Sequence, residues 1–129
     1  MPRPGVSPRP SPQRIHDMIR AIERIQDYTA GMDYARFCRD PKTVDAVVRN
    51  LEIIGEASKR VPKSLAALYT DADWRRIGAM RDKLIHDYAE TNTGLVWETV
   101  QTRLGSLDRA LRQMLQVAEQ NDRGGGKKR

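Results

Sequence analysis

The residue types best suited to catalysis gather in one octapeptide, Arg81-Asp-Lys-Leu-Ile-His86-Asp-Tyr88. An imidazole, with an ordinary pKa of about 6.5, can take a proton from a 2′-hydroxyl or give one to a leaving 5′-oxygen. A guanidinium presents a fixed fork of donors to the negative charge of a phosphorane. The pattern therefore favours cleavage of an RNA phosphodiester by Arg81 and His86 without a metal. Asp82, next to the arginine, is a candidate supporting residue.

Helical geometry complicates this reading of the motif. Residues seven apart share one stripe of a helix, so Arg81 and Tyr88 lie two turns apart on one side. His86 is rotated by about 140° from Arg81. The two could still meet at one phosphate if the helix ends near His86, or if a twofold dimer sets two copies of the motif side by side. Each residue alone also has a structural explanation: a salt-bridged arginine, a histidine at a helix end and a tyrosine capping the core.

Metal and cofactor sites are not expected. The only other histidine, His16, is predicted to lie on the surface of the first helix. The sequence has no cysteine pair and no His-x-x-x-His spacing, which zinc sites commonly use. The single cysteine, Cys38, is interpreted as a small packing residue in a reducing compartment, which favours a cytoplasmic protein.

Two further groups of residues have structural interpretations. Trp74 and Trp97 are predicted to pack in the helical core rather than to stack on bases. Glu52 and Glu56 lie one turn apart, and Glu56 is predicted to form a surface ion pair with Lys59 or Arg60.

Apolar stripes at helical spacing predict four main helices and a short turn. The first helix starts with Ser11 as N-cap and Pro12, and ends at Gly31. The others are expected from Asp40-Pro41 to Pro62, from Asp71 or Asp73 through the motif, and from Asn92-Thr93 to Ala118, with a helical turn at 63–69. Short connections favour an all-α antiparallel four- or five-helix bundle. Gly55, in mid-helix, costs about 1 kcal/mol relative to alanine and indicates a close helix crossing.

The chain is predicted to be one domain with two tails. Residues 1–11 form a Pro-rich disordered arm, because five of the seven prolines lie in residues 1–12. Residues 12–121 form the bundle, and residues 122–129 form a flexible basic tail. The tails supply most of the net charge of +6, leaving about +1 in the body, so charge alone defines no RNA-binding face. No apolar run approaches the roughly 20 residues of a membrane helix.

The motif and three other segments resemble a known family. Residues 81–88, RDKLIHDY, resemble the Arg-x(4)-His-x-Tyr motif of HepT-like toxins, which belong to the HEPN superfamily of helical ribonucleases. Asp82 fits the polar position of the wider pattern. Residues 47–57, VVRNLEIIGEA, are similar to the family's second-helix signature, and residues 74–80 and 95–97 follow its pattern too. The resemblance covers roughly residues 13–118.

This resemblance implies a homodimer in which two motifs share one cleft. It implies a metal-independent endoribonuclease acting on tRNA or mRNA, the toxin of a type VII HEPN/MNT toxin–antitoxin system. Arg81 would bind the phosphate, and His86 would be the acid and base. A partner nucleotidyltransferase, MntA-like, would neutralise the toxin by AMPylation of Tyr88. The alternative is a non-catalytic nucleotide- or substrate-binding partner of such a transferase.

Overall fold

The fold is built from helices alone in the part of the chain that the structure describes. The computed structural model describes residues 12–87 and 92–127, with side chains up to residue 120. The helices in these ranges are α1 (Pro12–Thr29), α2 (Tyr34–Cys38), α3 (Pro41–Lys59), α4 (Lys63–Ala66), α5 (Trp74–His86), α6 (Thr93–Thr102) and α7 (Leu104–Lys127). The predicted all-α class is therefore confirmed.

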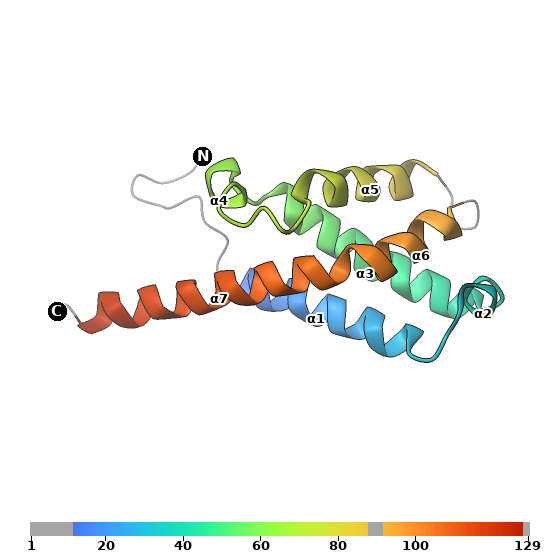
Figure 1. The fold of residues 1–129 in the computed structure, drawn as a ribbon, viewed down its shortest axis with the longest axis horizontal. Coiled ribbons are helices and arrows are strands. Elements are labelled where there is room, and N and C mark those ends of the chain that lie inside the picture. The colour runs from blue at the N-terminus through green and yellow to red at the C-terminus, as the bar shows by residue number, and fades with distance from the viewer. Residues whose placement is uncertain (1–11, 88–91, 128–129) are drawn as a thin grey trace.

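Four long helical segments run antiparallel to one another in the bundle (Figure 1). They are α1, α3, α5 and the nearly continuous pair α6 and α7, which only Arg103 separates. Helix α3 packs against both α1 and α5, and α1 also packs against α7. Each long helix turns one apolar stripe inward, and the fully buried side chains include Met18, Ile22, Ile25, Val47, Leu51, Ile54, Ile77, Val96, Leu107 and Leu111. The antiparallel bundle predicted from the stripes is confirmed.

Local capping explains several helix boundaries. The Asp40 carboxylate accepts a hydrogen bond from the Thr43 amide at 3.1 Å and begins α3. Asp73 does the same for α5, which selects it over Asp71 as the start of that helix. Gly31 follows α1 with a φ of 76°, the left-handed conformation expected of a glycine that ends a helix.

The short helix α2 was not expected from the sequence, because five residues are too few to show a helical period. It is capped by Asp33, which accepts from the Arg36 amide at 2.8 Å. Only Phe37 of this helix is buried. Cys38 is exposed, so its interpretation as a packing residue is wrong. A helix of one turn places one side chain in the core and leaves its neighbours outside.

The structure describes part of the predicted C-terminal tail but none of the predicted N-terminal arm. Residues 1–11, with the proposed Ser11 cap, lie outside the described residues. Helix α7 continues to Lys127, and its far end projects beyond the other helices (Figure 1). Its last six residues belong to the segment predicted to be a flexible tail, and that flexibility stays a prediction. None of the described helices combines the length and apolarity needed to cross a membrane.

Candidate functional site

Two glycines allow α3 and α5 to cross closely. A Cβ atom on Gly55 of α3 would lie 2.2 Å from the Cβ of Arg81 on α5. A Cβ on Gly78 of α5 would lie 2.9 Å from the Cγ of Lys59 on α3. Each helix therefore has a glycine at the point where a long basic side chain of the other helix passes. The close crossing predicted at Gly55 is confirmed, and the residue that needs the space is the arginine of the motif.

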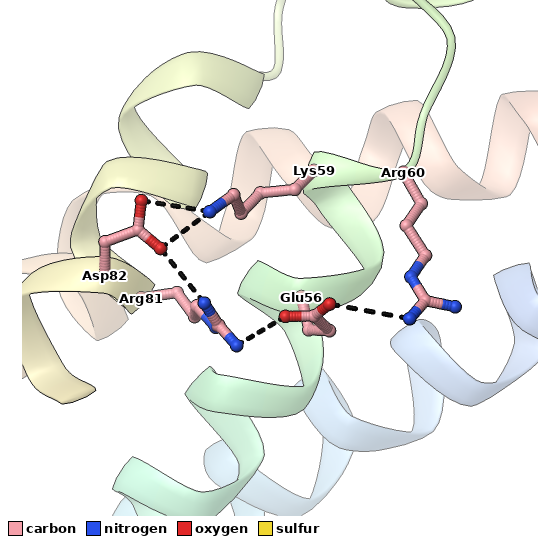
Figure 2. A network of polar contacts seen from close by, with 5 residues as sticks. All are labelled: Glu56, Lys59, Arg60, Arg81 and Asp82. Carbon is pink, nitrogen blue, oxygen red and sulfur yellow. Dashed lines mark hydrogen bonds and ion pairs between the residues drawn. The ribbon is translucent and has the colours of Figure 1, made fainter.

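A five-residue polar network covers this crossing (Figure 2). The Arg81 guanidinium pairs through Nη2 with Glu56 on α3, and through Nη1 with the Asp82 Oδ1 atom at 3.1 Å. Lys59 donates to both oxygens of Asp82, at 2.7 and 3.0 Å. Arg60 approaches Glu56 at 3.6 Å. Three cations share two carboxylates, so the network keeps one net positive charge.

Arg81 lies in the wall of a pocket formed by α1, α3 and α5. The pocket has a volume of about 550 Å³ and is also lined by Glu56, Arg60, Ile53 and Ile85. Only 26% of the Arg81 side chain is exposed. Its Nε atom is buried and has no hydrogen-bond partner among the described residues. The ligand-binding capacity of Arg81 therefore rests on its two Nη atoms, which carry four N–H donors and contact only Glu56 and Asp82 among the described residues.

Asp82 binds two of the three cations of the network, Lys59 and Arg81, as an ionised carboxylate. The hydrogen bond from Lys59, and then that from Arg81, lower the pKa of Asp82 below its usual value. A carboxylate with a lowered pKa is a poor proton donor near neutral pH. Asp82 is therefore suited to holding Lys59 and Arg81 in position rather than to exchanging protons.

His86 is the last residue of α5 and is exposed. The next residue, Asp87, is extended with φ −106° and ψ 157°, so the helix ends where one of the two hypotheses needs it to end. His86 lies one turn beyond Asp82 on the same side of α5, whereas Arg81 is directed towards α3. In the described part of the chain no hydrogen bond or ion pair joins Arg81 to His86.

The third residue of the motif, Tyr88, lies outside the described residues. The residues on either side of its segment are linked, because the Asn92 side-chain amide donates to the Asp87 carboxylate at 3.1 Å. This bond, followed by the one from Lys83, lowers the pKa of Asp87. The two residues that flank the segment, Asp87 and Asn92, are therefore in direct contact.

The network was only partly visible from the sequence. The predicted pairing of Glu56 with Arg60 occurs, but Glu56 also binds Arg81 of another helix. Lys59 does not join Glu56 but crosses to Asp82. The spacing of one helix could not show these contacts. The two mid-helix glycines were the available signal, and Gly78 was overlooked.

His16 and the two tryptophans lie where the sequence predicted them, on the surface of α1 and in the packing of the bundle. His16 is partly exposed on α1 and lies 4.0 Å from Glu119 of α7. Both tryptophans pack against the core. The Trp97 ring lies 5.1 Å from the Phe37 ring, and the Trp74 indole donates to the Tyr69 carbonyl at 3.0 Å. Within the described ranges, no group of three or more His, Cys, Asp or Glu side chains is arranged to hold a metal ion.

Comparison with known proteins gives a consistent result. The family described as "Ribonuclease HepT-like" matches residues 18–114. The chain is 42% identical over 93 residues to the "Probable ribonuclease HepT" of Thermococcus cleftensis, covering 72% of this chain and 84% of that protein. It is 36% identical over 110 residues to a "Putative RNase" of Caldanaerobacter subterraneus, covering 85% and 96%.

A third relative is a "Putative RNase" of Methanocaldococcus jannaschii, 32% identical over 108 residues, with 84% of this chain and 89% of that protein covered. No solved structure gives a significant match. The family match includes the Gly55 crossing, the five-residue network and His86. The all-α bundle and the motif of residues 81–86 thus have a common explanation: the chain belongs to the HepT-like ribonuclease family of the HEPN superfamily.

Proposed function

We propose that this protein is a metal-independent endoribonuclease that cleaves RNA in the cytoplasm as the toxin of a type VII HEPN/MNT toxin–antitoxin system. The observation that carries the proposal is the placement of Arg81. A glycine on the facing helix makes room for it, two carboxylates hold it, and it lines a pocket. The names of its relatives support ribonuclease activity for the family.

The proposed reaction needs only side chains of the motif. His86 takes the proton of the 2′-hydroxyl, and the 2′-oxygen attacks the adjacent phosphorus. Arg81 donates hydrogen bonds to the phosphorane oxygens as their negative charge grows. The bond from phosphorus to the 5′-oxygen then breaks, and that oxygen receives a proton from an imidazolium. The products are a 2′,3′-cyclic phosphate and a 5′-hydroxyl.

We further propose that a homodimer assembles this site. Arg81 and His86 leave α5 in different directions, so one chain alone does not aim both at one phosphate. Ile85, between them in the motif helix, lines the Arg81 pocket and has 54% of its surface exposed. A second copy covering Ile85 would bury this apolar surface and bring its own His86 towards Arg81.

The decisive experiment uses the purified protein with a chelator present and total RNA or tRNA as substrate. Arg81→Ala and His86→Ala should each lower the cleavage rate by about 10²-fold or more. Arg112→Ala and His16→Ala are matched controls, because Arg112 also binds two carboxylates and His16 also lies near an acid. The controls should remain within about threefold of the wild type. An inactive wild type, or equal activity of all variants, contradicts the proposal.

We propose that a minimal nucleotidyltransferase, MntA-like, is the antitoxin and transfers AMP to Tyr88. The sequence supports this, because Tyr88 follows His86 by only two residues. An AMP group there would add bulk and negative charge beside the cleft and so repel an RNA backbone.

Coexpression with the transferase tests this regulation. The intact mass should increase by one or more AMP groups, and peptide fragmentation should assign them to Tyr88. Tyr88→Phe should escape modification and remain toxic. Neutralisation of Tyr88→Phe as effective as that of the wild type would show that the antitoxin acts by occlusion alone.

The non-catalytic alternative has one observation in its favour: the Arg81 guanidinium is already engaged by two carboxylates, Glu56 and Asp82. In that case the pocket would bind a nucleotide without turnover. Calorimetry with ATP and AMP distinguishes the two functions. Nucleotide binding by a protein that leaves RNA intact supports the alternative, and RNA cleavage without nucleotide binding removes it.

A further inference from the structure

A second and larger hollow lies on the other side of the ion pair between Lys59 and Asp82. It has a volume of about 1050 Å³ and is formed by the end of α3, by α4 and by the start of α5. We call it the α4 groove, and its lining includes Lys59, Lys63, Trp74, Arg75, Asp82 and Arg103.

The α4 groove contains cations that the bundle does not use. The side chains of Lys63 and Arg75 form no hydrogen bond or ion pair with any described residue, although both line the groove and are exposed. Among the described residues, the side chain of Arg103 has two distant ion-pair partners, Asp73 and Glu98, each at 4.0 Å. Asp71 offsets one of these charges. A concave surface with a surplus of uncommitted cations favours phosphate groups.

The carboxylates of the groove, in contrast, are mostly committed. Asp73 caps α5 and pairs with Arg76 at 3.6 Å. Asp82 is held by Lys59 and Arg81. These two acids therefore do little to repel an anion, because their charges are already compensated by neighbouring cations.

The α4 groove and the Arg81 pocket are separate hollows that lie on the two sides of the contacts joining Lys59, Asp82 and Arg81. Asp82 and Lys59 line the groove, and Arg81, which Asp82 binds, lines the pocket. Figure 2 shows these side chains meeting between α3 and α5. A strand with one phosphate at Arg81 would therefore pass Lys59 and enter the groove. Trp74 is half-buried there, and its bond to the Tyr69 carbonyl fixes the indole beside that path.

We propose that the α4 groove binds the RNA strand that flanks the cleaved bond, with Lys63 and Arg75 contacting its phosphates. The ligand is a single-stranded ribonucleotide chain rather than a free nucleotide, because the unpaired cations extend beyond the Arg81 pocket along a groove. This inference rests on the proposed ribonuclease function and adds a substrate-binding site to it.

The test measures RNA binding separately from cleavage. The full-length protein carrying His86→Ala is titrated into fluorescein-labelled single-stranded RNA, and anisotropy is recorded at several salt concentrations. The groove variant adds Lys63→Gln and Arg75→Gln. The matched control adds Arg24→Gln and Lys42→Gln, which remove the same charge from exposed positions on α1 and α3.

The groove variant should bind RNA about tenfold more weakly, and its slope of log affinity against log salt should be shallower by about 1.4. The control should bind within about twofold of its parent, and melting temperatures should show that both variants fold. Equal losses in both variants would overturn the proposal, as would undetectable RNA binding by the parent.

Two further measurements separate this inference from the function on which it rests. With His86 restored, the groove variant should lose RNA cleavage mainly through a higher KM. If the wild type cleaves RNA but the groove variant matches the control, the groove is wrong and the ribonuclease stands. If the groove variant loses RNA affinity but the wild type never cleaves, the groove stands and the ribonuclease is wrong. A loss of ATP affinity with RNA affinity unchanged would assign the groove to free nucleotides and overturn the proposal.

Discussion

Arg81 and Arg112 make the same kind of bridge in two regions of the bundle. Arg112 on α7 binds Asp108 of its own helix at 3.0 Å and Glu23 of α1 at 3.2 Å. Arg81 on α5 likewise binds Asp82 of its own helix and Glu56 of α3. By ion-pair chemistry alone, the two arginines are equivalent.

Their surroundings differ. The Arg112 side chain is 54% exposed, whereas that of Arg81 is 26% exposed. The hydrogen bond that Arg112 donates to Asp108 is the largest cause of the raised pKa of Arg112, but exposed ion pairs contribute only about 0–1 kcal/mol to stability. Arg81 instead faces a glycine, lines a pocket and shares its carboxylates with Lys59 and Arg60. Both arginines form the same kind of ion pairs. The candidate catalytic arginine differs in its lower exposure, in the pocket beside it and in the neighbouring cations that share its carboxylates.

The largest expected effect is on RNA cleavage, when Arg81 and Arg112 are each replaced by lysine and the two variants are compared. Arg81→Lys should lower kcat/KM for RNA by about 10- to 100-fold, because an ammonium cannot hold two carboxylates and also bind a phosphate with a planar fork of donors. Arg112→Lys should stay within about twofold. Initial rates on labelled RNA measure both. Equal losses would show that the difference in surroundings has no functional meaning.

A smaller effect is expected on stability from the glycines of the two regions. Gly55→Ala should lower the free energy of unfolding by about 1–3 kcal/mol, because its Cβ would overlap the Cβ of Arg81. Gly105→Ala on α7 should be neutral or stabilising by up to about 1 kcal/mol. Its Cβ would meet no atom nearer than the Arg109 Nη1, at 3.7 Å. Urea denaturation measures both, and a neutral Gly55→Ala would contradict the close crossing.

The smallest effect concerns pH. Because the folded state lowers the pKa of Asp82, this carboxylate stabilises the protein above its unfolded pKa of about 3.9. The contribution should disappear as the pH falls through the lowered folded value. The melting temperature of Asp82→Asn should therefore be below that of the wild type near pH 7, and the difference should shrink below about pH 4. A difference that stays constant into acid would show that Asp82 does not act through its charge.

The sequence by itself determined the helices and the motif. Apolar stripes, the caps Asp40 and Asp73 and the terminating glycine Gly31 act within a few residues of the chain, so they could be predicted without a fold. Gly55 also indicated a close crossing, since a glycine in a helix needs compensation. The short helix α2 was missed, and the exposure of Cys38 with it, because one helical turn leaves no periodic signal.

Only the tertiary structure decided which residues meet. Lys59 and Asp82 are 23 residues apart, and the partner of Arg81 on α3 follows from how far each helix is rotated and where the two cross. The α4 groove likewise exists only because the end of α3 and the start of α5 are brought to one place. Helical spacing fixes which side chains share a face of one helix, but it contains no information on the rotation of one helix against another, and that rotation creates the site.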